Sequence, residues 1–348
     1  MSEGRRVVLS ALAESPLEAV DKMTLEDQPE PTELGPRDVV IAIESAQVGW
    51  VDLLMTAGQY QHQPKPPYTP GLEYAGKVAR AGAEVKSVKE GDAVLVDGFR
   101  AGPRSLGAYQ GSGGFASWAV VPEEAVLKIP GKLSFDQACN LLGNYETAIH
   151  CLITRGKLQA GETVLIHGAS GATGLAAVHV AKLVGATVIA TGRSKEKLAV
   201  VKEQGADHVI GTANLKDDVR AIAKDGVDVV YDGVGGDISV QSLRCVKFGA
   251  RFLIVGWAST PFVAKTSPNQ LPTNLIMMKG LDVLGCPTVI STVMNPSIRK
   301  ARFERLWSWA ESGALKPYVS KTFPLADFKD AMRAKWNGEI VGGCCVRP

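Results

Sequence analysis

Three glycines at a regular spacing stand near the middle of the chain, in the run Gly168-Ala-Ser-Gly171-Ala-Thr-Gly174. A glycine adopts backbone conformations that other residues avoid, and it lets a ligand approach the backbone closely. The apolar run 163–167 before these glycines predicts a buried strand, and the pattern over 172–184 predicts a helix. N–H groups at a helix start bind phosphate oxygens, so this turn is predicted to hold a dinucleotide pyrophosphate. The predicted phosphate-binding residues are Ser170, Gly171, Ala172 and Thr173.

The next predicted strand, 187–191, ends without the carboxylate that usually binds the ribose of NAD. No Asp or Glu lies between Glu162 and Glu196, and the strand is followed by Gly192-Arg193-Ser194-Lys195-Glu196-Lys197. A guanidinium and an ammonium suit a 2′-phosphate. We therefore predict NADP(H) as the cofactor, with Gly192, Arg193 and Lys197 at its 2′-phosphate. The alternative is an ordinary solvated basic helix start.

Three further cofactor-binding candidates follow the predicted strands 227–232 and 251–256. These are Val234, Gly256 and Trp257. Ligands of parallel sheets bind at the carboxyl ends of the strands, which is where these residues would lie. For Trp257, plain packing is the alternative.

The elements that must position these residues divide the chain into three predicted segments. Residues 1–131 are rich in β-branched residues, Gly and Pro and predict a β-rich domain, with strands at 38–43, 73–79, 93–96 and 115–121. Strands and helices alternate over 132–290, including a predicted helix at 239–248, which is typical of a doubly wound parallel (Rossmann) sheet. Residues 291–348 do not continue this alternation and are predicted to return to the first domain.

The amino-acid composition limits which class of protein this is and which kinds of partner it could bind. The chain has 348 residues, 45% apolar and 21% charged, with a formal net charge of +2. This is typical of a two-domain globular protein and gives no indication of a nucleic-acid partner. No apolar run is long enough to span a bilayer. The six scattered cysteines, several in apolar segments, favour reduced thiols and a cytoplasmic location.

Several motifs together resemble the zinc-free NADPH:quinone oxidoreductase (zeta-crystallin-like) branch of the medium-chain dehydrogenase/reductase superfamily. They are 52–60, 67–76, 113–122, 145–148, 161–171 and 249–257. The resemblance implies a GroES-like catalytic domain formed by the N-terminal part and the C-terminal tail, and a Thr147 near the nicotinamide. Gly49 departs from the family pattern because it stands where an Asn is expected. The resemblance, and the apolar predicted edge strand 281–285, also indicate a homodimer.

No metal site is predicted. Zinc-dependent relatives place a His beside a Glu after a Pro-Gly turn, and here that position is Leu72, before Glu73. No cysteine lies between residues 90 and 115, where a structural zinc would need several. The adjacent pair Cys344 and Cys345 is poor ligand spacing and is typical of strand residues that face opposite sides.

Tyr60 is the candidate catalytic residue. Hydride added to an enone or an enoyl thioester leaves an enolate that needs a hydrogen-bond donor and a proton. Related enoyl-thioester reductases carry a Tyr after a Gly at this place, although a Tyr that only packs a cleft wall is an equal alternative.

The sequence as a whole predicts an NADPH-dependent enzyme that transfers hydride to a quinone or an electron-poor C=C such as an enone. One alternative is an enoyl-thioester reductase, for which Lys65, Arg100 and Arg104 border the predicted cleft loops. The other is a low-turnover NADP(H)-binding structural or regulatory protein.

Overall fold

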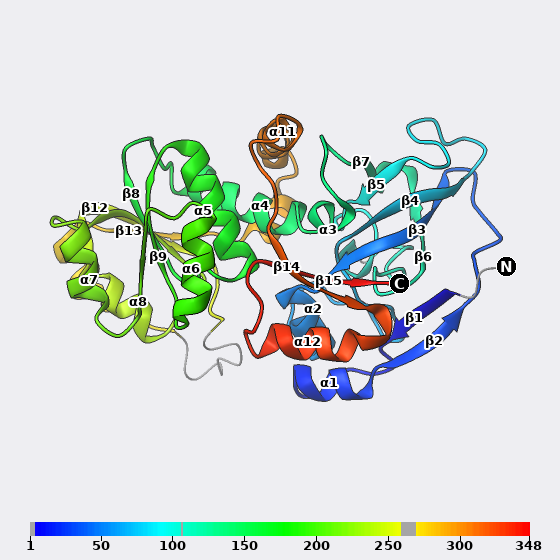
Figure 1. The fold of residues 1–348 in the computed structure, drawn as a ribbon, viewed down its shortest axis with the longest axis horizontal. Coiled ribbons are helices and arrows are strands. Elements are labelled where there is room, and N and C mark those ends of the chain that lie inside the picture. The colour runs from blue at the N-terminus through cyan, green and yellow to red at the C-terminus, as the bar shows by residue number, and fades with distance from the viewer. Residues whose placement is uncertain (1–3, 106, 259–268) are drawn as a thin grey trace. The chain divides into compact units, whose positions relative to one another are not determined.

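The computed structural model describes residues 4–105, 107–258 and 269–348, which fall into two compact units (Figure 1). The first unit contains the residues up to Leu142 together with Ala310–Pro348, and the second is the continuous segment Gly143–Trp309. The chain therefore leaves the first unit, builds the second and returns. The domain boundaries drawn from the sequence, after residues 131 and 290, stay a prediction.

The first unit is built on a seven-stranded sheet in the order β14-β15-β3-β4-β5-β7, with β6 also paired to β3. Its strands are β3 (Asp38–Gln47), β4 (Tyr74–Ala81), β5 (Ala93–Val96), β6 (Trp118–Pro122), β7 (Val126–Lys128), β14 (Val319–Pro324) and β15 (Gly343–Arg347). A separate antiparallel pair, which the sequence analysis did not identify, consists of β1 (Gly4–Val8) and β2 (Thr24–Gln28). The helices are α1 (Pro16–Lys22), α2 (Trp50–Thr56), α3 (Phe135–Ala138) and α12 (Phe328–Trp336).

The C-terminal segment completes the first unit. Strand β15 pairs antiparallel with β3, and β14 pairs parallel with β15. Phe328 and Met332 of α12 pack into the same apolar core as Val39 and Ile41 of β3, and α12 lies beside α1 and α2 in Figure 1. The β-rich domain predicted from both ends of the chain is thus confirmed.

The second unit is a six-stranded parallel sheet in the order β10-β9-β8-β11-β12-β13. Its strands are β8 (Thr163–Ile166), β9 (Thr187–Thr191), β10 (His208–Ile210), β11 (Val227–Asp232), β12 (Val246–Ile254) and β13 (Asp282–Gly285). Its helices are α4 (Leu142–Ile149), which starts at the boundary, α5 (Ala172–Val184), α6 (Lys195–Glu203), α7 (Leu215–Ile222), α8 (Asp237–Ser242), α9 (Thr273–Lys279), α10 (Thr288–Met294) and α11 (Ile298–Glu311), which ends past the boundary.

This sheet is the predicted doubly wound fold. Strands β8 and β11 are almost entirely buried, as strands covered on both faces must be. The strand order reverses between β8 and β11, and ligands of such sheets bind at this point, outside the carboxyl ends of the strands. The helix predicted over 239–248 is wrong beyond Ser242, because Val246 already pairs with Val227 of β11 in the sheet.

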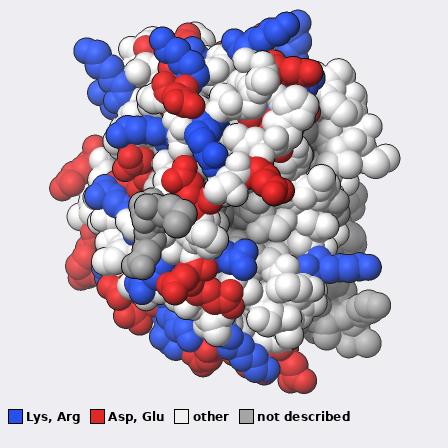
Figure 2. All heavy atoms as spheres, turned by 90° about the vertical axis from the view of Figure 1, so that its right-hand side faces the viewer, with Lys and Arg blue, Asp and Glu red and all other residues white. Residues whose placement is uncertain are grey.

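Within the described ranges, no helix is both long and apolar enough to cross a membrane. On the face of the molecule drawn in Figure 2, basic and acidic side chains are intermixed. The first unit contains ion pairs such as Arg6 with Glu26 and Arg80 with Glu30.

Candidate functional site

The glycine-rich turn after β8 is tightly folded. Gly168 has a φ of 62°, in the left-handed region, and its carbonyl oxygen accepts a hydrogen bond of 2.9 Å from the Gly171 N–H. A Cβ on Gly174 would lie 2.3 Å from that carbonyl oxygen, so no larger residue fits there. The first N–H groups of α5 have no partner within the helix and are available to phosphate oxygens. Ser170, Gly171, Ala172 and Thr173 all belong to this turn or to the first turn of α5.

The end of β9 lies next to this turn, since the Ala169 N–H donates to the Thr191 carbonyl at 3.1 Å. Gly192 and Arg193 follow, and Arg193 is exposed. Helix α6 is capped by Ser194, whose hydroxyl oxygen accepts from the Lys197 N–H at 3.2 Å. The same hydroxyl donates to Glu196 at 2.7 Å, which lowers the pKa of that carboxyl. The Glu196 carboxylate is therefore held at the start of α6.

Asp232, at the end of β11, shapes the loop that carries Val234. One of its carboxylate oxygens accepts the N–H groups of Val234 and Gly235 at 2.9 and 3.0 Å, and the other accepts the Ser239 hydroxyl. A Cβ on Gly168 would lie 3.0 Å from Val234 Cγ2, so Val234 borders the glycine turn. Asp232 was not among the predicted site residues, although an Asp followed by Gly-Val-Gly-Gly after a strand is a turn signal.

The loop after β12 packs on the loop after β11. The N–H groups of Val255 and Gly256 donate to the Asp232 carbonyl at 2.8 and 3.2 Å. A Cβ on Gly235 would lie 3.0 Å from Trp257 Cβ, and the Trp257 side chain is 53% exposed. Val234, Gly256 and Trp257 are thus brought together beside the glycine turn.

Helix α4 carries Thr147 and is held by buried polar contacts. The Thr173 hydroxyl of α5 donates to Asn144 Oδ1 at 3.3 Å. The buried carboxylate of Glu146 accepts hydrogen bonds from Arg299 and Arg302 of α11, with the shortest contact at 2.7 Å. These flanking contacts fix the helix turn on which Thr147 is half-buried, and the sequence pattern did not reveal them.

His167, between β8 and the glycine turn, is a buried structural residue. Its ring nitrogens lie 2.9 Å from the Thr191 hydroxyl and 2.6 Å from the Ser242 hydroxyl. Burial lowers the pKa of His167 to about 4, so the ring is neutral at pH 7. It connects the ends of β8 and β9 to α8.

Tyr60 lies in the first unit, in the loop after α2, and is half-buried. Burial raises the pKa of its hydroxyl, and the Arg104 guanidinium opposes that increase. Arg104 is itself buried, with Nη2 lying 3.5 Å from Glu73 Oε1 and its guanidinium over the Phe99 ring. Tyr60 therefore stays a protonated donor at neutral pH.

Asp52 supports the same part of the first unit. Its carboxylate accepts the N–H groups of Gly49, Gly71 and Leu72 at 2.9, 3.1 and 3.0 Å. Gly49 is the N-cap of α2, and a Cβ there would lie 2.7 Å from Asp52 Oδ2. Leu72 is buried where the zinc enzymes carry a ligand. Among the residues that the structure describes, no group of three or more His, Cys, Asp or Glu side chains is arranged to hold a metal ion.

The cofactor candidates thus gather at the carboxyl ends of the parallel strands of the second unit, whereas Tyr60 belongs to the first unit. Two family models match segments of the sequence. The alcohol dehydrogenase GroES-like domain matches residues 35–131, and the zinc-binding dehydrogenase family matches residues 172–309.

Curated and solved relatives extend over nearly the whole chain. A quinone oxidoreductase-like protein 2 homolog of Nematostella vectensis is 33% identical over 345 residues, which cover 97% of this chain and 88% of that protein. The quinone oxidoreductase of Thermus thermophilus, solved also in complex with NADPH, is 28% identical with a TM-score of 0.77, covering 99% of this chain and 100% of that one. A probable oxidoreductase of Mycobacterium abscessus is 27% identical with a TM-score of 0.83, covering 100% of both chains.

A dinucleotide cradle on a parallel sheet, in one chain with a GroES-like β-rich unit, defines the medium-chain class of dehydrogenases and reductases. Within that class, the chain belongs to the zinc-free quinone oxidoreductase branch.

Proposed function

We propose that this chain is an oxidoreductase that transfers hydride from NADPH to a quinone or to an electron-poor carbon–carbon double bond such as that of an enone. The observation that carries the proposal is the glycine cradle in a relative of quinone oxidoreductases. The next strand, β9, ends without a carboxylate and is followed by Arg193. The cofactor is NADP(H), which supplies the hydride when it is bound.

The second unit binds and orients the cofactor. The N–H groups of the turn at Ser170, Gly171, Ala172 and Thr173 hold the pyrophosphate, and Gly192, Arg193 and Lys197 accommodate the 2′-phosphate. Thr147, Val234, Gly256 and Trp257 are assigned to the nicotinamide half, because they lie on α4 and on the loops after β11 and β12.

Tyr60 holds the proton that an alkene substrate needs. Its Oη donates a hydrogen bond to the oxygen on which negative charge develops, and then a proton. Burial favours the neutral phenol, and the buried cation of Arg104 makes loss of the proton to substrate less costly.

The test of this role is the Tyr60→Phe variant, which removes the hydroxyl and keeps the ring. We expect enone turnover to fall by about 10²–10⁴-fold. Quinone turnover should fall less, since a reduced quinone takes protons from water, and NADPH affinity should stay constant. Tyr109→Phe is the matched control, because its hydroxyl donates to Asp38 of the same unit. Unchanged turnover on both substrates would leave Tyr60 as a packing residue.

The cofactor assignment is tested with Arg193→Ala. Losing a charged hydrogen bond to phosphate costs about 1.5–3 kcal/mol, so the NADPH dissociation constant should rise about 10–100-fold. NADH affinity should not change. Lys224→Ala removes another exposed cation of the second unit and serves as the control. Equal weakening of NADPH and NADH would contradict the 2′-phosphate contact.

An enoyl thioester belongs in the same substrate panel. Of the three cations considered for its phosphates, Arg104 is buried beside Glu73 and Arg100 lies 3.7 Å from Asp97. Lys65 is exposed, and it is the cation of this set that best suits a phosphate. We further propose a cytoplasmic location, supported by six buried cysteines in thiol form, and a homodimer.

A further inference from the structure

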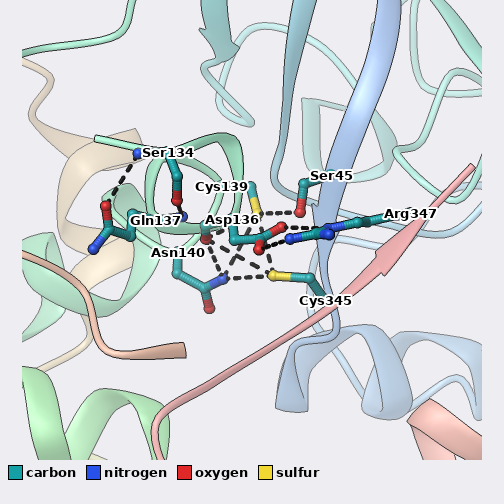
Figure 3. A network of polar contacts seen from close by, with 8 residues as sticks. All are labelled: Ser45, Ser134, Asp136, Gln137, Cys139, Asn140, Cys345 and Arg347. Carbon is teal, nitrogen blue, oxygen red and sulfur yellow. Dashed lines mark hydrogen bonds and ion pairs between the residues drawn. The ribbon is translucent and has the colours of Figure 1, made fainter. Parts of the chain in front are cut away.

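Two cysteines that are far apart in the sequence face each other in the first unit (Figure 3). Cys139 follows α3 and Cys345 lies on β15, and their sulfur atoms are 3.6 Å apart. Both are buried. A disulfide bond is about 2.0 Å long, so the two sulfur atoms would have to approach each other by roughly 1.5 Å to form one.

The pair lies in a polar pocket and not among apolar side chains alone. Asn140 Nδ2 donates to Cys345 Sγ at 3.1 Å, and the Ser45 hydroxyl lies 3.4 Å from Cys139 Sγ. The Asp136 carbonyl accepts from Asn140 Nδ2 at 2.8 Å and lies 3.4 Å from Cys139 Sγ. Donors aimed at one sulfur stabilise its thiolate, which is the reactive form of a cysteine.

The two thiols are chemically unequal as a result. The hydrogen bond from the Cys139 thiol lowers the pKa of Cys345, whereas burial raises the pKa of Cys139. Cys345 is therefore the better nucleophile of the two. Cys139 is the thiol placed to attack Cys345 once Cys345 has been oxidised.

Local contacts hold the two sulfurs in this position. Arg347 of β15 donates to both carboxylate oxygens of Asp136, from Nε at 3.0 Å and from Nη2. Gly343 leaves room for Asn140, because a Cβ there would lie 2.6 Å from Asn140 Oδ1. A capping box of Ser134 and Gln137 fixes the start of α3, as Figure 3 shows.

We propose that Cys139 and Cys345 are a redox site that a hydroperoxide converts reversibly to a disulfide. The Cys345 thiolate attacks one peroxide oxygen, the O–O bond breaks, and the leaving oxygen departs as water or an alcohol after taking a proton. The sulfenic acid on Cys345 is then attacked by the Cys139 sulfur, which loses its proton as the S–S bond forms and a second water leaves. Two thiols are oxidised, and one peroxide is reduced.

The disulfide would join two residues that are separated in the sequence by a long segment of the chain. The two cysteines are 206 positions apart, and the whole second unit lies between them in the sequence. A cross-link that closes a long loop stabilises the folded state chiefly by restricting the unfolded chain. Oxidation should therefore raise the unfolding temperature of the first unit and leave the cofactor residues of the second unit in place.

The experiment exposes the purified protein to hydrogen peroxide, alkylates the remaining thiols in denaturant and maps the peptides by mass spectrometry. We expect a peptide pair joined through Cys139 and Cys345, lighter by two hydrogen atoms and released by dithiothreitol. Because both thiols are buried, the cross-link should form slowly, at the rate of local opening. This map of the wild-type protein does not depend on the folding of any variant.

Variants distinguish the site from general thiol oxidation. Cys139→Ser should leave Cys345 to accumulate as sulfenic or sulfinic acid, whereas Cys344→Ser should not affect the cross-link, since Cys344 packs in the apolar core. The proposal is overturned if both thiols stay free while exposed methionines become oxidised. It is also overturned if the cross-link joins Cys151 to Cys286, the other thiol pair in contact.

Discussion

Asp52 is a residue whose stability contribution depends on pH. Burial raises its pKa from 3.8 to about 6, although three N–H groups bind the carboxylate. The folded state thus holds a proton more tightly than the unfolded chain, so the group favours folding below pH 4 and loses that contribution as the pH rises toward 6.

The variant Asp52→Asn removes this titration and makes the effect measurable. Between pH 4 and pH 7 the wild-type protein should lose on the order of 2–3 kcal/mol of unfolding free energy relative to the variant. Urea unfolding of both proteins at the two pH values gives this double difference. A difference that stays constant with pH would show that Asp52 is ionised across the whole range.

The sequence revealed the types of site residue better than their surroundings. The glycine spacing predicted the turn after β8, because glycine is needed where φ is positive or where backbones touch. It gave no sign that Arg104 is an internal cation beside Glu73 or that Glu146 binds two arginines. Such contacts join residues from distant segments, and no local pattern records them.

At the scale of elements, the loop after β11 is a small rigid unit that depends on Asp232. The variant Asp232→Ala removes the carboxylate oxygen that accepts the N–H groups of Val234 and Gly235, which costs about 1–3 kcal/mol of stability. NADPH and NADH affinities should fall together, because this loop does not follow β9. Fluorescence titration measures both, and Asp237→Ala, at the exposed start of α8, is the control. A loss confined to NADPH would contradict this account.

Helices and strands were predictable where one periodicity of apolar residues dominated the local sequence. Strands β5, β9 and β11 and helix α5 begin and end at the predicted residues, because short apolar runs and a helix bounded by glycines have clear limits. Strands β1, β2, β7 and β14 were missed. Strands β2 and β14 are largely exposed on both faces, so their sequences show no alternation of apolar and polar residues.

At the scale of the whole molecule, β13 is an edge strand of the second unit with apolar neighbours. The exposed large apolar residues of the flanking elements β12, α9 and α10 are Phe248, Ile254, Met277, Met278, Ile290, Val293 and Met294. An unpaired strand edge beside exposed apolar side chains favours association with a second copy.

We therefore predict a homodimer at micromolar concentration by analytical ultracentrifugation. Met277→Glu combined with Met294→Glu should convert it to a monomer, because both side chains are more than 70% exposed in the single chain. Leu12→Glu changes an exposed apolar residue of the first unit and should leave the dimer intact. A wild-type monomer would exclude the prediction, and dissociation by Leu12→Glu would place the interface elsewhere.

The return of the chain to its first unit sets an order of events during translation. Gln47 of β3 pairs with Cys345 of β15, and at roughly 5–20 residues per second the ribosome needs about 15–60 s between these partners. The second unit is continuous and has all its strands before β15 is made. The part of the chain synthesised first is thus the last to complete its sheet. Until β15 is made, residues 38–42 of β3 already pair with β6, whereas residues 46 and 47 on the same edge still lack their β15 partner.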